Sequence, residues 1–188
     1  GIRDILVLGK IKQMERARLA DLLILDAPAA GHAITFLQSA SGLADAVPIG
    51  PINSQAKEVL ELLGDPGRCQ VMLVTLPEET PVNELVETAY QLEDRVGISL
   101  GPVVVNGLYP PLPGLDVAPS AAAEAAGASL RPGEAEALEA AASFRRERME
   151  LQAEQIGRLA EALPLAQLSL PYLFDAELGP DQLDTLAT

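Results

Sequence analysis

The chain has 188 residues, enough for one ordinary domain with a sizeable core, and 48% of them are apolar. Only 3% are aromatic and none is tryptophan, so the core must be built mainly from Leu, Val, Ile and Ala. The formal net charge of −14 argues against electrostatic binding to nucleic acid or to an anionic membrane. A single phosphate site remains compatible with that charge, because it needs only a few local donors.

Cysteine usage and hydropathy limit the class of protein further. Cys69 is the only cysteine, which excludes an internal disulfide and a thiolate zinc site within one chain. No apolar run reaches the roughly 18–20 residues of a membrane span, and no signal-peptide pattern opens the chain. We therefore expect a cytoplasmic protein without a membrane span. Because the first residue is Gly1 rather than Met, we also allow for a truncated sequence.

The first half of the chain alternates helical and strand patterns. Residues 2–18 carry apolar side chains near helical spacing, which predicts an amphipathic helix. Residues 21–26, "DLLILD", are too short and too continuously apolar for such a helix, and predict a buried parallel strand. A helix is expected to start near Gly31, another to cover residues 54–64, and a second buried strand to cover residues 69–79.

The second half continues the alternation with one interruption. Thr80 is expected to cap a helix that ends at Gly97, and a third strand is expected to end at Asn106. Residues 109–133 are rich in Pro, Ala and Gly and predict a loop with a little helix. The remaining predicted elements are a long helix over Glu134–Ala162, a fourth strand within residues 165–175 and a short closing helix.

This order of elements predicts the α/β class, with a parallel sheet flanked by helices. The connections between successive strands are long enough for parallel crossovers. Only about four strands are expected, which is few for such a sheet. We therefore predict a single α/β domain over residues 1–188 that forms the C-terminal portion of a larger domain.

Ligands of open parallel sheets bind at the carboxyl ends of the strands, where polar turns are expected here. Asp26 follows the first strand, so its carboxylate could hold Mg²⁺ directly or through water, or could be an ordinary turn residue or helix cap. His32, the only histidine, could contact a phosphate or a switch segment, or could be a locally bonded first-turn residue. The amide of Asn106 suits the edge of a purine base, and equally suits an ordinary turn.

We interpret the remaining candidate residues as structural rather than functional. Cys69 opens a predicted buried strand, so we interpret it as a core residue rather than half of a Cys–His dyad with His32. The arginines of "FRRERMELQ", residues 144–152, could bind an anion, but we interpret them as a solvated helix face with i,i+4 pairs. The alanine-rich residues 121–126 are interpreted as a linker.

Three stretches together resemble a known family. "LDAPAAGHAITFL" resembles the DTAPTGHT signature of the ArsA-type ATPases, with Ala27 and Ala30 in place of its threonines. These ATPases include the arsenite-pump ATPase and the ATPase that targets tail-anchored membrane proteins. "VVVNGLYPP" is similar to the family's strand that ends in Asn before an adenine-contacting turn, and residues 144–187 are similar to its C-terminal helix, last strand and adenine loop. The similarity runs in order over nearly the whole chain.

The resemblance implies a deviant P-loop NTPase fold of the SIMIBI type that uses ATP and Mg²⁺. Asp26 would bind Mg²⁺ through water. Pro28, Gly31 and His32 would belong to switch II, which moves with the γ-phosphate state, and His32 is the candidate catalytic residue.

The resemblance also implies a base site and a dimer. Asn106 would hydrogen-bond adenine, and Pro171 with Tyr172 would form a wall beside the base. Members of the family act as nucleotide-gated homodimers or pseudo-dimers, so we expect a homodimer or a paralogous heterodimer that serves an unknown protein client.

The sequence also departs from the family pattern. It contains no GKGGVGKT-like loop, so we expect that loop in an N-terminal part outside these residues, and we expect the 188 residues alone not to hydrolyse ATP. The helical insertion that forms the client groove in tail-anchored targeting is reduced to little more than residues 39–63, and the paired zinc cysteines are absent. Tail-anchored targeting is therefore not expected, and arsenite pumping is not expected either, because Cys69 alone cannot make an arsenite site.

The leading hypothesis is a portion of an ArsA-like ATPase, and three alternatives stay open. The first is a non-enzymatic or degenerate nucleotide-binding subunit that regulates an active partner. The second is an ATP-independent interaction module built on the helix Glu134–Ala162. The third is a MinD- or ParA-type ATPase, which is ranked lower because the acidic C-terminus offers neither a membrane tail nor a basic DNA-binding surface.

Overall fold

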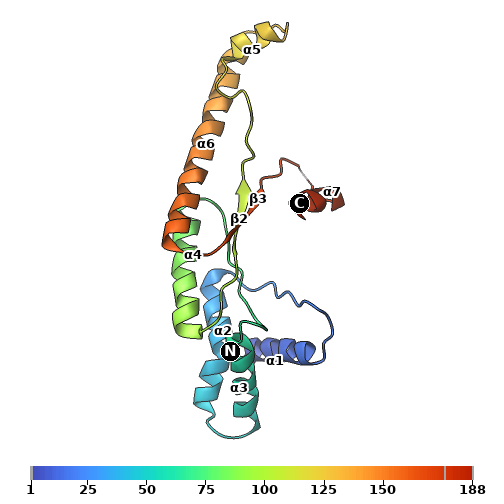
Figure 1. Ribbon diagram of the computed structural model, residues 1–188, viewed down its shortest axis with the longest axis vertical. Coiled ribbons are helices and arrows are strands. Elements are labelled where there is room, and N and C mark those ends of the chain that lie inside the picture. The colour runs from blue at the N-terminus through green and yellow to red at the C-terminus, as the bar shows by residue number, and fades with distance from the viewer. Residues whose placement is uncertain (1, 176, 188) are drawn as a thin grey trace. The chain divides into compact units, whose positions relative to one another are not determined.

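The computed structural model describes residues 2–175 and 177–187 of the chain (Figure 1). The chain forms two compact units, each with its own internal contacts. The first unit comprises Gly1–Leu73 and Asn83–Val103, and the second comprises Val74–Val82 and Val104–Thr188.

Three helices build most of the first unit: α1 (Ile2–Arg16), α2 (Ala30–Ala46) and α3 (Pro51–Gly64). They pack on one another around a shared core, to which α2 and α3 each contribute more than one buried apolar side chain and α1 contributes Leu8. The buried members of this core are Leu8, Phe36, Leu37, Ala40, Val59, Leu63, Leu92 and Ile98. The start of α2 next to Gly31 and the helix over Ile2–Arg16 confirm two predictions from the sequence pattern.

Buried polar side chains also join these helices. Lys12 on α1 is only 2% exposed, and its ammonium donates hydrogen bonds to Gln55 at 2.5 Å and to Glu58 at 2.6 Å, both on α3. The hydrogen bond from Lys12 lowers the pKa of Glu58 below its ordinary value of 4.5. The side chain of Asn53 donates to the carbonyl of Ala44 at 2.9 Å and so ties α3 to α2.

The next helix is α4 (Glu79–Gln91), and it continues into the single π-type turn η1 (Leu92–Val96). It begins one residue earlier than the predicted cap at Thr80. Gly97 ends it with a φ of 69°, a left-handed conformation that glycine adopts without the cost of a Cβ. Gly97 therefore acts as the terminator that the sequence predicts.

The sheet is parallel and three-stranded, in the order β1–β2–β3, and helices flank it, which confirms the α/β class. Its strands are β1 (Val74–Thr75), β2 (Val103–Leu108) and β3 (Gln167–Pro171). Val74 pairs with Val104 and Thr75 with Val105. The next residue after β3, Tyr172, donates its amide to the carbonyl of Leu108 at 2.7 Å.

Three helices complete the second unit: α5 (Pro119–Ala125), α6 (Glu134–Ala162) and α7 (Pro180–Ala187). The bounds of α6 match the prediction residue for residue. Residues 121–126 were expected to be a linker, but most of them belong to α5, because Pro119 at its first turn and a run of alanines favour a helix. No helix within the described residues has the length and apolarity needed to cross a membrane.

Two predicted strands need correction. Residues 21–26 form no strand, and Leu22 and Ile24 are 73% and 85% exposed. A parallel strand forms only where a neighbouring strand accepts and donates its backbone hydrogen bonds, and no described residue pairs with this stretch. The expected buried strand over residues 69–79 is reduced to a bridge between Val71 and Leu100 and to the short β1, and it exposes Met72 and Val74.

Candidate functional site

The turn before α2 holds the residues predicted to bind Mg²⁺ and to form the switch. Asp26, Pro28, Gly31 and His32 all lie in this extended segment or in the first turn of α2, and all four are exposed. The helix begins without a side-chain cap, and the amides of His32 and Ala33 bond the carbonyl of Ala29 at 2.8 and 3.1 Å. The start of α2 therefore presents an uncapped, accessible helix end in the segment that follows Asp26 in the chain.

Glycine at position 31 is not required by steric crowding. A Cβ added to Gly31 would have no atom within 4 Å, and its φ lies outside the left-handed region. Within the described residues, no group of three or more His, Cys, Asp or Glu side chains gathers to hold a metal ion. Mg²⁺ commonly needs only one or two carboxylates, with waters and phosphates as its other ligands, so Asp26 alone remains compatible with that ion.

The second predicted part of the site lies in the second unit, at the ends of β2 and β3. Asn106 is exposed near the end of β2, which continues to Leu108 rather than ending at Asn106. Val103 and Val105 point into the core, so the alternation of the strand places Asn106 on the opposite side. Pro171 ends β3, and the bond from Tyr172 to Leu108 places these two strand ends next to each other.

An aromatic cluster surrounds these strand ends. Tyr109, Tyr172 and Phe174 contact one another at ring-centroid distances of 4.7–5.6 Å, with the interplanar angles of edge-to-face and tilted pairs. The chain has only three Tyr and three Phe, so half of them gather here. Phe174 is 64% exposed and Tyr172 is 44% exposed, which leaves apolar ring surface open to a ligand.

Arg145 on α6 holds this aromatic cluster from one side. Its guanidinium carbon lies 4.7 Å from the ring centroid of Tyr109 and 5.0 Å from that of Phe174, within the range of cation–π contacts. One of its Nη atoms donates to the carbonyl of Pro110 at 2.7 Å. The aromatic cluster is thereby fixed to α6 as well as to the sheet.

The arginines of residues 144–152 are therefore not the solvated face expected from the sequence. Arg145 contacts the aromatic cluster, Arg146 bonds the carbonyl of Leu115 and pairs with Glu139, and Arg148 pairs with Glu78. The physical reason is helical spacing, because Arg145 and Arg148 lie one turn apart on a face of α6 that is turned toward other segments. Glu78 follows β1, so Arg148 reaches the end of that strand too.

Gln152 continues the same face of α6. It is 4% exposed, and its carboxamide forms two hydrogen bonds with the end of β2. The oxygen accepts the amide of Tyr109 at 2.9 Å, and the nitrogen donates to the carbonyl of Gly107 at 3.1 Å. Gly107 has a φ of 76°, and a Cβ there would lie 3.6 Å from Leu76 and 3.8 Å from Tyr172.

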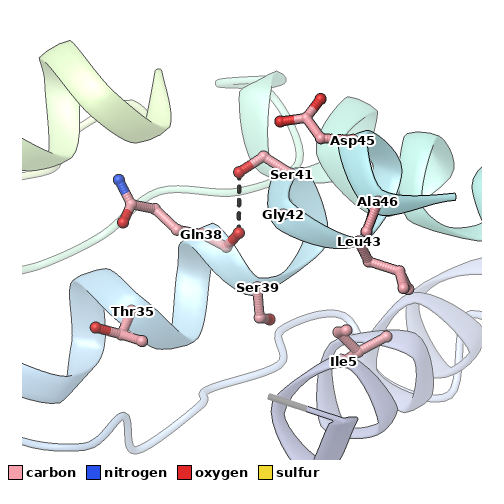
Figure 2. A pocket seen from close by; sticks show the side chains of 9 residues that line it. All are labelled: Ile5, Thr35, Gln38, Ser39, Ser41, Gly42, Leu43, Asp45 and Ala46. Carbon is pink, nitrogen blue, oxygen red and sulfur yellow. Dashed lines mark hydrogen bonds between the residues drawn. The ribbon is translucent and has the colours of Figure 1, made fainter. Parts of the chain in front are cut away.

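A shallow hollow lies elsewhere, in the first unit. Figure 2 shows this pocket of about 580 Å³ between Ile5 of α1 and side chains of α2 that include Thr35, Gln38 and Asp45. The hydroxyl of Ser41 donates to the carbonyl of Gln38 at 2.9 Å along one wall. No residue predicted from the sequence to bind ATP or Mg²⁺ lines this pocket.

Cys69 is not part of either predicted site region. It packs against the core of the first unit, and burial raises the pKa of its thiol. A raised pKa reduces the thiolate fraction and with it the nucleophilicity of the sulfur. The interpretation of Cys69 as a core residue agrees with this environment.

Four residues at these strand ends were not predicted from the sequence as site residues: Tyr109, Phe174, Arg145 and Gln152. A signal was available for the aromatic residues, because Tyr109 comes soon after the predicted strand end at Asn106, and Tyr172 and Phe174 lie near the end of the range predicted for the fourth strand. A second signal was the spacing of Arg145, Arg148 and Gln152, which places them on one helical face.

Comparisons with known proteins relate the chain to proteins named as ATPases. No family model matches the chain. The chain is 33% identical over 140 residues to the ATPase BagA of Mycobacterium tuberculosis, an alignment that covers 71% of this chain and 41% of BagA. Mb3704 of Mycobacterium bovis, an ATPase by name, matches over the same length at the same identity.

A third relative comes from Halobacterium salinarum and is assigned by name as an arsenical pump-driving ATPase. It is 32% identical over 98 residues, which cover 48% of this chain and 15% of that protein. The chain spans about two fifths of the length of the mycobacterial relatives. Together these matches support a relationship to the ArsA-like ATPases.

Proposed function

We propose that the chain is part of an ArsA-like, Mg²⁺-dependent ATPase of the cytoplasm. The observation that carries the proposal is the arrangement at the adjacent ends of β2 and β3 in the second unit. Asn106 is exposed near the end of β2, and the rings of Tyr172 and Phe174 after β3 are exposed to a ligand. Asn106 would hydrogen-bond the adenine edge, and Pro171 with Tyr172 would form the wall beside the base. The similarity to proteins named as ATPases supports this role for the whole protein.

The turn before α2 would supply the metal and switch functions. Asp26 would hold Mg²⁺ through water, in the way that a single carboxylate shares the ion with nucleotide phosphates. Pro28, Gly31 and His32 would form the segment that responds to the γ-phosphate, with His32 as its candidate catalytic residue. Their exposure and the missing side-chain cap of α2 are compatible with a segment that changes partners between nucleotide states.

In this proposal the protein works as a homodimer or a paralogous heterodimer whose closure is coupled to ATP. A partner that binds the ATP-bound state more tightly than the ADP-bound state would be the client.

A second candidate function is a nucleotide-binding subunit without catalysis that regulates an active partner. Such a subunit would bind nucleotide at the same strand ends but would lack the glycine-rich loop and lysine that hold the β- and γ-phosphates for turnover. Both candidates share the same base site, so they differ in turnover rather than in base recognition.

Nucleotide binding and turnover of the natural full-length protein separate the two candidates. We expect Mg²⁺-dependent release of phosphate from ATP, and removal of Mg²⁺ by a chelator should stop it. Binding of ATP without any turnover would instead favour the regulatory subunit. A protein that binds no ATP at all would contradict both.

A further inference from the structure

One face of α6 contacts the carboxyl ends of all three strands of the sheet. Arg148 pairs with Glu78 after β1, Gln152 bonds Gly107 and Tyr109 at the end of β2, and Arg145 lies against Phe174, which follows β3. We call Arg145, Arg148 and Gln152 the α6 seam. Because ligands of open parallel sheets bind at these strand ends, the seam supports the position where the base is expected.

Gln152 fixes the backbone at the carboxyl end of β2. Its carboxamide accepts from the amide of Tyr109 and donates to the carbonyl of Gly107, as a peptide group of a neighbouring parallel strand would. At 4% exposure, its two bonds are shielded from water, and loss of either would leave a buried polar group unpaired. The bonds therefore define the backbone path on both sides of Leu108.

The same bonds control the orientation of Asn106. Gly107 leaves the regular strand conformation with a φ of 76°, directly after Asn106, and Gln152 holds the carbonyl of that glycine. Asn106 is exposed, so its direction depends on the backbone rather than on packing of its own side chain. A shift of Gly107 would move the amide of Asn106 with it.

We propose that Gln152 is a positioning residue that sets the preference of this site for adenine over guanine. The inference rests on the proposed function, because it assigns selectivity to the base site proposed there. An asparagine amide can accept from the exocyclic amino group of adenine and donate to the neighbouring ring nitrogen. On the edge that carries N7, guanine presents two acceptors, O6 and N7, so an Asn106 held in one place forms two hydrogen bonds with adenine and only one with guanine.

The test compares the affinities for ATP and GTP in the natural full-length protein and in three variants. Gln152→Leu removes both bonds, and Gln152→Glu keeps the acceptor for Tyr109 while it loses the donor to Gly107. Gln155→Leu is the matched control, because Gln155 is equally buried on α6 but accepts its hydrogen bond from Arg158 on the same helix. Exchange of the Tyr109 amide with deuterium reports directly on its hydrogen bond to Gln152.

We expect the ratio of ATP to GTP affinity to fall about tenfold in Gln152→Leu, with faster exchange of the Tyr109 amide. The control Gln155→Leu should keep the wild-type ratio even if it lowers stability. An unchanged ratio in Gln152→Leu would overturn the inference and leave the proposed function intact. If Gln152→Leu does not fold, the ratio of ATP to GTP affinity in Gln152→Glu decides the question. A wild-type protein that binds neither ATP nor GTP would overturn both this inference and the proposed function.

Discussion

The two predicted parts of the nucleotide site differ in how the protein holds them. In the first unit, residues 21–29 run without regular structure, and Asp26, Pro28 and His32 are exposed. In the second unit, the strand ends around Asn106 are bound by Gln152, Arg145 and an aromatic cluster. A segment that must respond to the γ-phosphate needs freedom to change partners, whereas a surface that recognises a base needs a fixed geometry. The difference therefore agrees with the roles proposed for the two parts.

The largest effect is expected at the exposed turn. Asp26→Asn in the natural full-length protein should lower Mg²⁺-dependent ATP turnover by about a thousandfold, which corresponds to about 4 kcal/mol of transition-state stabilisation. Stability should change little, because Asp26 is exposed. Phosphate release and urea unfolding of the same samples measure the two quantities. Asp21→Asn, in the same exposed stretch, is the control and should keep wild-type turnover.

The next largest effect concerns the cores of the two units. Leu92 in the first unit and Leu159 in the second are each 1% exposed, so truncation of either to Ala should cost about 2–4 kcal/mol of unfolding free energy. Leu22→Ala, at 73% exposure, should change it by less than about 0.5 kcal/mol. Urea unfolding, followed by hydrogen exchange in each unit, measures the changes. A large cost for Leu22→Ala would show that residues 21–26 are packed after all.

A smaller effect depends on pH and is confined to the first unit. The hydrogen bond from Lys12 lowers the pKa of Glu58 in the folded state, so the pair stabilises the fold fully above the ordinary value of 4.5. That stabilisation is lost as the pH falls below 4.5 through the lowered pKa, because the carboxylate takes up a proton. The urea midpoint of the first unit, measured as a function of pH, should therefore fall in that acid range.

Two variants on α3 sharpen this prediction. Glu58→Gln should flatten the acid limb of the profile, because the titrating group is gone. Glu61→Gln, an exposed position on the same helix, should leave that limb unchanged. Equal slopes in the wild type and in Glu58→Gln would contradict the assignment to Glu58.

The smallest effect is expected at the aromatic cluster. Arg145→Met should lower the unfolding free energy by about 0.5–1.5 kcal/mol, because it removes the cation–π contacts with Tyr109 and Phe174 and the bond to Pro110. Arg131→Met is the control, since the side chain of Arg131 is 86% exposed and surface ion pairs contribute little. Chemical unfolding of both variants tests whether the strand ends are held as tightly as the geometry indicates.

Local patterns predicted the helices well and the strands less well. The bounds of α6 and the end of η1 at Gly97 follow from periodicity and from a glycine signal, which depend on neighbouring residues alone. The stretch 21–26 has the composition of a strand, but a strand also needs a partner, and pairing is not encoded in the stretch itself.

In the candidate site, too, local patterns predicted some features, whereas others depend on contacts between residues far apart in the chain. The rule for parallel sheets predicts that polar turns after neighbouring strands meet, and the ends of β2 and β3 do lie side by side. The bond from Gln152 to Gly107 joins residues 45 positions apart, so no local pattern contains it. Whether Asp26 and His32 act on the same nucleotide as Asn106 stays a prediction.

The most direct test of the central claim is photolabelling of the natural full-length protein with azido-ATP, whose reactive group is on the adenine ring. Mass spectrometry of the labelled peptides should place the label within residues 106–109 or 171–174, and excess ATP should prevent it. Label confined to other parts of the chain, or labelling that excess ATP does not reduce, would contradict a base site at the ends of β2 and β3.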